Sequence, residues 1–423
     1  MKLNRALIPI FLIVLVDIFG LTLVIPLLAI YAESLHATPL QATLLVSVFA
    51  VCQLISGPLL GQLSDRIGRK PVLLVSQLGT LVGFLILARA GSLWMVFLSR
   101  IIDGATAGNL SIAQAYIADN TRPEDRTKSF ALIGIAFGLG FFIGPWVTGY
   151  LASYGLGAPI YLAALMSLLS VVCTLALLPG GRPPQHEPRP TPEAGAPPLP
   201  AGKRLSVLEW SSYSQYLQRP VLGGLLLQFL CFALSFATFT SGFALFAERR
   251  LTWNGHPFTP REVGYLFGYS GFLGLMWQGG LITRLVRRFG EPRLTAAGFL
   301  AVAVSSTALG LVYRVPALVV IATIASFGNG VLRPVLSSLV SQQAAAHEQG
   351  VVLGLTQSLQ SLASIVAPPL AGFLIEHGRL GPWAWVSAAA ALLGLVAGRF
   401  GSAQARPRPV APAAGAAPDP REG

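Results

Sequence analysis

Charged residues are scarce in this chain. Asp, Glu, Lys and Arg make up 11% of its 423 residues, whereas apolar residues make up 53%. A soluble protein of this size needs more polar side chains to cover its surface, so water is not its main solvent. The net charge of +12 would suit nucleic acid only if the basic residues clustered on one surface, and they lie instead in short gaps between apolar runs. We expect the lipid bilayer as a partner, and no nucleic acid.

Cysteines and nucleotide-binding motifs are also few or missing. The three cysteines, Cys52, Cys173 and Cys231, fall inside apolar runs without metal-ligand spacing, so we expect small buried hydrophobic side chains and no metal site. No Walker-type phosphate-binding sequence occurs in the chain, which argues against ATP-driven activity by this chain alone. We expect neither an enzyme nor a bound cofactor.

Long apolar runs dominate the sequence. A hydrocarbon core of ~30 Å needs ~20 helical residues, and lipid offers no partner for unpaired backbone groups. Each run is therefore predicted to be a transmembrane helix, which gives an all-α membrane protein with twelve spans in two six-helix bundles. The predicted spans are residues 6–30, 41–63, 71–90, 93–117, 128–152, 157–178, 221–246, 262–283, 293–313, 315–341, 350–375 and 381–399.

The spans divide into two groups around a Pro-rich segment. We expect a bundle at residues 1–178, a cytoplasmic linker at 179–220, a second bundle at 221–399 and a disordered tail at 400–423. With the N-terminus inside, 21 of the 29 Lys and Arg residues fall on inner segments and six on outer loops. This asymmetry predicts a multi-pass protein of the cell membrane with both termini in the cytoplasm.

Internal repeats relate the two groups. The segment from Gly61 to Arg66, after the second span, is echoed by Gly279 to Arg284 after the eighth, and Pro145 aligns with Pro369. Two homologous halves around a central crevice are typical of a rocking transporter.

Four charged residues lie well inside the predicted spans: Asp17, Arg100, Asp103 and Arg333. Each costs about 2.5–3.5 kcal/mol to insert, so such residues usually face a hydrated cavity or a partner and mark function. The alternative is a buried ion pair that only fixes helix packing. Burial disfavours a charged carboxylate and an approaching cation favours it, so a conformational change around Asp17 could load and release a proton. Asp17 and Asp103 are the candidate proton-coupling residues.

Polar side chains recur at helical spacing in three spans. In the fourth span Arg100 and Asp103 share one face, which further polar residues continue, and the tenth and eleventh spans carry similar stripes. These residues either line a cavity or hydrogen-bond neighbouring helices. The candidate substrate-cavity residues are Arg100, Asn109, Gln114, Asn329, Arg333 and Gln357.

Two glycine-containing motifs stand out. The first runs from Gly61 to Lys70, where a generic basic loop would explain the charges but not the glycines and the aspartate; its candidate gating residues are Gly61, Asp65, Arg66, Gly68, Arg69 and Lys70. The second lies in the fifth span, where small residues permit close helix packing and proline weakens the backbone ladder. Its candidate residues are Gly140, Gly144, Pro145 and Gly149.

Together these segments resemble the major facilitator superfamily, and within it the drug/proton antiporters most similar to tetracycline exporters. The Gly61–Lys70 loop resembles the superfamily signature, and the glycines of the fifth span resemble the antiporter motif, with Thr148 where a glycine is usual. The first span resembles the tetracycline-exporter run that begins at Asp17, with Thr22 replacing its second glycine.

The resemblance implies proton-coupled export of a hydrophobic or amphipathic small molecule, driven by the proton gradient, by a chain that we expect to be a monomer. It implies roles for Asp17 and Arg100 and a gating role for Asp65 and Arg69. Two alternatives remain: a proton-coupled transporter of a metabolite such as a sugar or carboxylate, with Arg100 or Arg333 binding it, and a receptor or channel. The repeated inner-loop signature argues against the last.

Overall fold

The computed structural model describes residues 7–121, 126–178, 215–343 and 349–402. In the first half its helices are α1 (Leu7–Val24), α2 (Leu28–Ser34), α3 (Pro39–Ile67), α4 (Arg69–Ala88), α5 (Leu93–Ala105), α6 (Asn109–Asp119), α7 (Arg126–Leu151), the 3-10 turn η2 (Ala152–Tyr154) and α8 (Gly157–Leu177). The second half has α10 (Pro220–Arg250), α11 (Pro260–Met276), the π-helical η3 (Trp277–Leu281), α12 (Ile282–Phe289), α13 (Glu291–Leu309), α14 (Val315–Gln342), α15 (Gln349–Glu376) and α16 (Leu380–Ser402). A short hairpin of β1 (Thr252–Trp253) and β2 (His256–Pro257) follows α10.

Within the described residues, each predicted span is covered by one helix or by two or three consecutive helices. Among the described residues nine helices are individually long and apolar enough to cross a membrane, and α1 with α2 forms a tenth span with a 43° bend. The two other predicted spans are divided, the fourth between α5 and α6 and the eighth among α11, η3 and α12. Most of the predicted linker lies at residues 179–214, outside the described part of the chain, as does the predicted tail from residue 403 onward.

At the break in the fourth span, a hydroxyl group from a neighbouring helix forms hydrogen bonds with the free backbone groups. Ser76 on α4 donates a hydrogen bond to the carbonyl of Thr106 and accepts one of 2.9 Å from the backbone N–H of Gly108. Backbone groups freed within a membrane must find partners inside the protein. The side chain of Ser76 therefore lets this span interrupt its helix just before Asn109.

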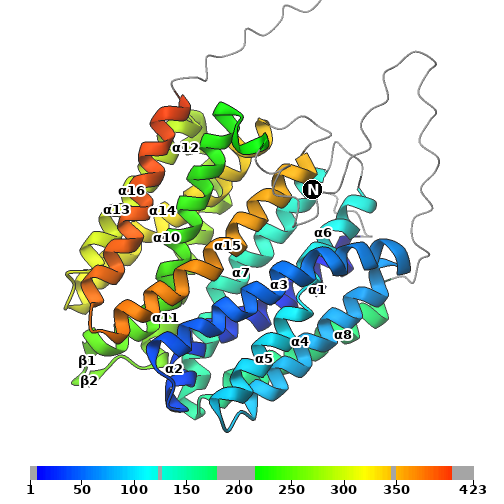
Figure 1. The fold of residues 1–423 in the computed structure, drawn as a ribbon, viewed down its shortest axis with the longest axis horizontal. Helices are drawn as coiled ribbons and strands as arrows, with labels where there is room; N and C mark the ends of the chain where they lie inside the picture. Colours follow the sequence, from blue (N-terminus) through cyan, green and yellow to red (C-terminus); the bar gives the residue numbers. More distant parts are fainter. Residues whose placement is uncertain (1–6, 122–125, 179–214, 344–348, 403–423) are drawn as a thin grey trace, which may run out of the picture.

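The helices form two bundles that lie side by side in Figure 1. Each has its own apolar core, one around Leu23, Leu45 and Phe84 in the first half and one around Phe243 and Trp383 in the second. Contacts between the bundles are made mainly by α7 with α11 and by α3 with α15. The architecture is the predicted twelve-span arrangement in two six-helix bundles.

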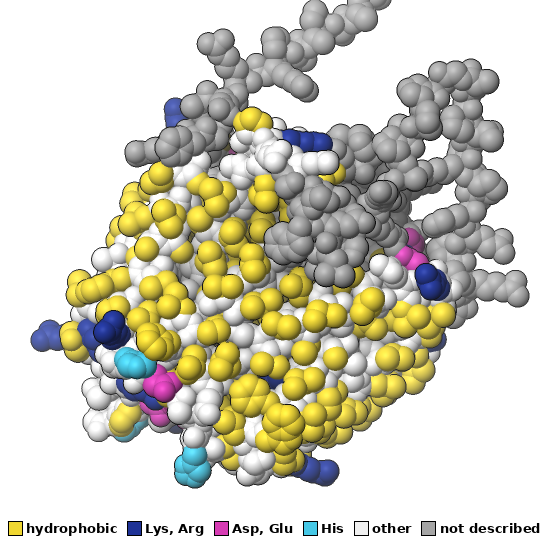
Figure 2. Space-filling model, viewed as in Figure 1, with side chains coloured by type: hydrophobic (Ala, Val, Ile, Leu, Met, Phe, Trp, Pro, Cys, Tyr) yellow, Lys and Arg dark blue, Asp and Glu magenta, His cyan; other side chains and the backbone are white. Residues whose placement is uncertain are grey.

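The exterior is apolar. Figure 2 shows hydrophobic side chains over the middle of one face, with most visible charged side chains toward its two ends. Large aliphatic side chains such as Leu165, Leu175 and Leu393 are more than half exposed. An exposed apolar surface of this extent fits hydrocarbon rather than water.

Helices α1 and α7 pack closely through the glycines of the fifth span. Gly140 and Gly144 face Ile18 and Thr22, and Thr22 is fully buried there. Thr148 donates a hydrogen bond of 2.8 Å to the carbonyl of Leu23 on α1. Thr22 and Thr148, which replace glycines of the related motifs, thus lie in the same helix interface.

We expect Gly144→Ala to destabilise the protein, because the new methyl group would overlap the side chain of Thr22. Overpacking of this kind costs about 1–3 kcal/mol. The apparent melting temperature in detergent should fall, and the double variant with Thr22→Gly should recover part of the loss.

Gly134→Ala on the same helix is the matched control, since no described atom lies within 4 Å of a methyl group there. Equal melting temperatures for Gly144→Ala and Gly134→Ala would show that the α1–α7 contact is not as tight as described.

Candidate functional site

The Gly61–Lys70 motif ties three helix ends together. Arg69 forms ion pairs with Asp65 at 2.6 Å and with Asp119, at the end of α6, at 2.8 Å. Lys70 donates hydrogen bonds to the carbonyls of Leu175 and Leu178 at the end of α8, at 2.9 and 2.6 Å. The predicted gating residues therefore hold the ends of α3, α6 and α8 in fixed positions. Arg66, another residue of the motif, is exposed.

Gly68 forms the turn between α3 and α4. Its φ of 102° and ψ of 157° are accessible to glycine and are strained for other residues. The second half repeats this geometry at Gly290, with φ of 77° and ψ of 155°, between α12 and α13. The residue after each glycine contacts the end of another helix. Arg69 forms an ion pair with Asp119 at the end of α6, and Glu291 accepts a 2.9 Å hydrogen bond from Ser338 near the end of α14.

The structure changes the alignment that the sequence predicts between the repeated segments of the two halves. Aligning Gly61 with Gly279 would place Gly68 opposite Val286, whereas the equivalent turn lies four residues later at Gly290. The difference follows the π-helical segment η3, in which Gly280 departs from helical geometry. The second half therefore carries an additional helical turn before its loop.

Arg100 and Asp103 form a buried ion pair on α5. Their side chains approach to 3.1 Å, and each residue is 4% exposed. The guanidinium of Arg100 also lies 5.7 Å from the centre of the Phe84 ring on α4. The structure brings these two predicted residues together inside the first bundle, where both are buried.

Asp17 lies on α1 among polar side chains from three other helices. Gln77 on α4, Asn109 on α6 and Ser170 on α8 lie beside its carboxyl group as neutral hydrogen-bonding partners. Gln77 donates a 2.7 Å hydrogen bond to Ser170. Within the described residues Asp17 forms no ion pair. Gln77 was missed in the sequence, although an amide inside an apolar run is the signal that could have identified it.

The remaining predicted cavity residues differ in exposure. Arg333 on α14 is exposed, with its guanidinium 5.5 Å from the centre of the Phe137 ring on α7 of the other bundle. Gln114 and Gln357 are exposed, and Asn109 and Asn329 are half-buried. Among the four charged residues, Arg333 is the one whose described contact crosses between the bundles.

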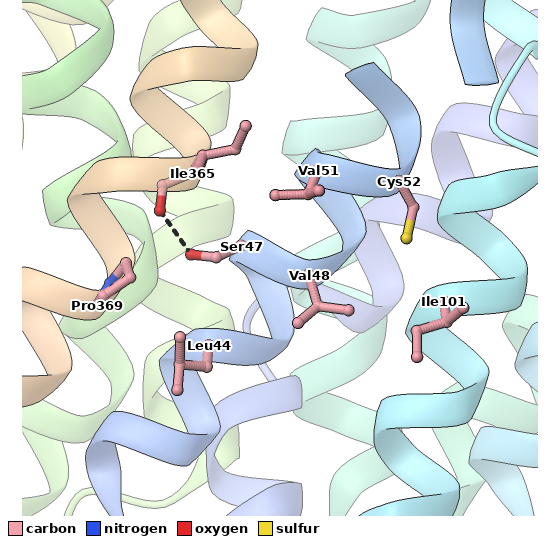
Figure 3. A pocket seen from close by; sticks show the side chains of 8 residues that line it. All are labelled: Leu44, Ser47, Val48, Val51, Cys52, Ile101, Ile365 and Pro369. Carbon is pink, nitrogen blue, oxygen red and sulfur yellow. Dashed lines mark hydrogen bonds between the residues drawn. The ribbon is translucent and has the colours of Figure 1, made fainter. Parts of the chain in front are cut away.

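An apolar pocket of about 510 Å³ lies between the bundles. Figure 3 shows Ser47, on its wall, donating a 2.9 Å hydrogen bond to the carbonyl of Ile365. The pocket size falls within the range of small-molecule sites. None of the six predicted cavity residues lines it. The lining residues are Leu44, Ser47, Val48, Val51 and Cys52 on α3, Ile101 on α5, and Ile365 and Pro369 on α15.

The bundles are joined by an ion pair at the end that carries α2 and the β1–β2 hairpin, which we call the hairpin end. Arg249 at the end of α10 contacts both carboxylate oxygens of Glu33 on α2, at 2.5 and 3.3 Å. Glu376 on α15 accepts a 3.1 Å hydrogen bond from the backbone N–H of Leu40 on α3. The sequence analysis counted Arg249 as an outer-loop charge and missed this pairing, since residues 216 positions apart give no local signal.

Helices α3 and α15 pack closely near the hairpin end. Near the hairpin end, Gly372 on α15 packs against Leu40 and Thr43 on α3. Farther along, a methyl group added at Gly57 or Gly61 on α3 would meet no described atom within 4 Å. The two bundles are therefore closely packed along α3 at the hairpin end, and the space beside Gly57 and Gly61 is open.

Comparisons with known proteins agree with this architecture. The family model described as Major Facilitator Superfamily matches residues 10–306 and 279–421. The tetracycline resistance protein of class B from Escherichia coli is 29% identical over 387 residues, covering 88% of this chain and 90% of that protein. The class C protein from Escherichia coli is 30% identical over 375 residues, covering 87% and 89%.

A solved structure shares the fold. The crystal structure of the human organic anion transporter MFSD10 (TETRAN) matches with a TM-score of 0.69 at 23% identity, covering 94% of this chain and 100% of that one. At this identity the match bears on the arrangement of the helices alone.

We expect Gly68→Ala to lower the free energy of unfolding by about 1–3 kcal/mol, because alanine is strained at this φ and ψ. Gly61→Ala is the control, since its helical position has open space around it. The measurement is thermal unfolding in detergent. A Gly68→Ala protein as stable as Gly61→Ala would contradict the strained turn.

We expect Arg249→Ala to loosen the hairpin end, because it removes the ion pair to Glu33. In a cysteine-free background, a reporter cysteine at Thr43→Cys, a position 1% exposed between the bundles, should react faster with a water-soluble thiol reagent. Arg250→Ala is the matched control, since Arg250 binds the carbonyls of Val312 and Gly310 within its own bundle. Equal labelling rates in the two variants would rule out a closing role for Arg249.

Proposed function

Because the chain belongs to the major facilitator superfamily, we propose that this membrane transporter exports a hydrophobic or amphipathic small molecule in exchange for protons. The observation that carries the proposal is Asp17, a carboxyl group within a span that has no ionic partner among the described residues. Such a group is stable at that depth as the acid or beside a cation, so its charge can follow the state of the transporter. The similarity to two proteins described as tetracycline resistance proteins supports export of a small molecule as the function.

Alternating access supplies the coupling. We place the hairpin end outside and both termini in the cytoplasm, as the distribution of basic residues predicts. In this orientation the ion pair between Glu33 and Arg249 and the packing of Gly372 on α3 close the outer side. Rocking of one bundle against the other would open that side and change the surroundings of Asp17. A proton would bind from outside as the substrate leaves, and it would be released inside as the next substrate molecule binds.

Several of the predicted residues have a place in this scheme. Asp17 takes up the proton, and Asp103, fixed by Arg100, holds a second negative charge nearby. Arg69 and Asp65 keep the inner ends of the first bundle together while the bundles rock. The glycines of α7 let it slide closely against α1 and α11.

The apolar pocket supports a hydrophobic substrate. Its lining is almost entirely aliphatic, with Ser47 as its polar exception besides the thiol of Cys52. A compound entering between α3 and α15 would gain from removing apolar surface from water, at about 25 cal/mol per Å². We expect the chain to work as a monomer, driven by the proton gradient without a bound cofactor.

A proton-coupled transporter of a metabolite such as a sugar or carboxylate is the second candidate. One observation favours an anionic substrate: Arg333 is exposed on α14 and faces Phe137 of the other bundle. A guanidinium in that position could bind a carboxylate with two parallel hydrogen bonds. A panel of neutral, cationic and anionic compounds in inverted membrane vesicles separates the two candidates, since the second requires carboxylate or sugar transport.

We expect Asp17→Asn to abolish proton-driven export, because an amide cannot take up and release the proton. Uptake of a fluorescent hydrophobic compound into energised inverted vesicles should fall to the level seen with a protonophore, while Asp17→Glu should keep part of the rate. Membrane abundance should match the wild type. Protonophore-sensitive uptake at the wild-type rate in Asp17→Asn would refute the coupling role of this residue.

A further inference from the structure

Three charged groups meet where the two bundles touch at the hairpin end. Arg249 on α10 contacts both carboxylate oxygens of Glu33 on α2. Its Nη1 atom also lies 3.8 Å from Oε2 of Glu248, the preceding residue on α10. Two carboxylates, one from each bundle, therefore share one guanidinium. When both carboxylates are ionised, the group carries one excess negative charge.

The hydrogen-bond donors of Arg249 do not reach Glu248. Nη1 has two N–H groups, and it donates to Oε2 of Glu33 at 3.3 Å and to the carbonyl of Leu245 at 3.2 Å. At 3.8 Å, Oε2 of Glu248 is within ion-pair distance of Nη1 but beyond hydrogen-bonding distance. This oxygen is buried and has no hydrogen-bond partner among the described residues. Buried polar atoms are nearly always satisfied, so one donor is missing at Glu248.

The other charged side chains near this end of α10 have different partners in the described part of the chain. Arg250 donates to the carbonyls of Gly310 and Val312, Arg261 donates to Tyr265, Glu262 accepts from Thr259, and Glu376 accepts from Leu40. Ring nitrogens of His256 and His377 contact the carbonyls of Pro257 and Phe373. Glu33 and Arg249 are therefore the charged groups that face Glu248.

Closing of the hairpin end changes the surroundings of Glu248. Glu33 belongs to the other bundle, so rocking the bundles apart would leave Glu248 in water beside Arg249. Closing removes water from Oε2 and brings a second carboxylate to the same cation. Both changes disfavour the ionised form of a carboxyl group. Closing therefore favours proton uptake at Glu248, and by linkage the closed end is stabilised at low pH and loses that stabilisation as the pH rises.

Glu248 also lies where protons from water can reach it. Helix α10 has 31 residues and is about 46 Å long, whereas the hydrocarbon core is ~30 Å thick. Glu248 is the third residue from the end of this helix. Its side chain is 38% exposed although Oε2 itself is buried. The group therefore lies at the aqueous rim of the contact between the bundles.

We propose that Glu248 is a second proton-binding residue of this transporter and that its protonation, beside Glu33 and Arg249, closes the hairpin end. The proposal rests on the proposed function, because closing of this end belongs to the rocking cycle. It deepens that function by adding a proton-dependent step at the gate, apart from Asp17. A proton taken up at Glu248 as the substrate leaves would favour closing for the return step.

Thiol labelling of the purified full-length protein in detergent tests the proposal. The parent protein carries Thr43→Cys in a cysteine-free background, since this position is 1% exposed between the bundles. At about pH 8, Glu248→Gln should react about two- to fivefold more slowly than the parent, because the amide is neutral and supplies an N–H donor. As the pH is lowered, the ratio of the two rates should approach one. The ratio cancels the pH dependence of the thiol reaction itself.

Glu262→Gln is the matched control. Glu262 also lies at the hairpin end, but its carboxylate accepts hydrogen bonds from Thr259 at the start of its own helix. This variant should react at the parent rate at every pH. Glu248→Ala serves as a second variant, because it removes the titrating group without adding a donor. The ratio of its rate to the parent rate should also change with pH, in the same pH range.

Parent-to-variant ratios that stay constant with pH, for Glu248→Gln or for Glu248→Ala, would overturn the proposal. The same change of ratio in Glu262→Gln would also overturn it, because the effect would then not belong to Glu248. If one of the two Glu248 variants fails to fold, the other gives the decisive ratio.

Failure of this proposal and failure of the proposed function are distinguishable. Proton-driven export is measured separately in inverted vesicles. Protonophore-sensitive export together with a constant labelling ratio would refute the role of Glu248 and leave proton antiport standing. A labelling ratio that changes with pH in a protein without proton-driven export would support the role of Glu248 and refute the proton coupling.

Discussion

Charge placed at bilayer depth has to be neutralised within the protein, because hydrocarbon provides no solvation for it. The first bundle meets this constraint in two ways. Arg100 and Asp103 neutralise each other at 3.1 Å, an arrangement that is costly to change and therefore suited to a fixed element. Asp17 has amide and hydroxyl neighbours but no ionic partner among the described residues. In the proposed cycle its charge changes as it takes up and releases a proton, whereas Asp103 stays paired with Arg100.

The interface between the bundles has two kinds of contact, and both suit the rocking motion that we propose. At the hairpin end, Glu33 binds Arg249 and Gly372 packs against α3. Along α7 and α11 the backbones approach so closely that Gly264 lies against Pro145 and Gly149. Glycine at these positions lets the two backbones approach closely, whereas the exposed ion pair is a contact of small energy, as the proposed rocking requires.

Much of this architecture could be predicted from local patterns. Twelve apolar runs correspond to the spans because lipid leaves helix as the available structure for each run. The family membership and the two-bundle fold were also predicted, from motifs whose glycines have a geometric role, such as Gly68 in its turn. Long-range pairings were not accessible in the same way. The partners of Asp17 come from spans 60 to 153 residues away, and the Glu33–Arg249 ion pair joins opposite halves, so no periodicity within one helix could identify them.

The substrate-cavity residues illustrate where a single-helix pattern is not sufficient. Arg100 and Gln114 were assigned to one polar stripe on the assumption that the fourth span is a continuous helix. The interruption between α5 and α6 breaks this continuity, and Arg100 is buried while Gln114 is exposed. Thr22 and Thr148 show that two departures from a family pattern can belong to one contact in the structure. Each departs from a family glycine, and taken alone each would weaken the resemblance, but both lie in the α1–α7 interface, where Thr22 fills the space beside Gly144 and Thr148 bonds to Leu23. The two departures are therefore parts of one repacked contact, which keeps α1, and with it Asp17, in position against α7.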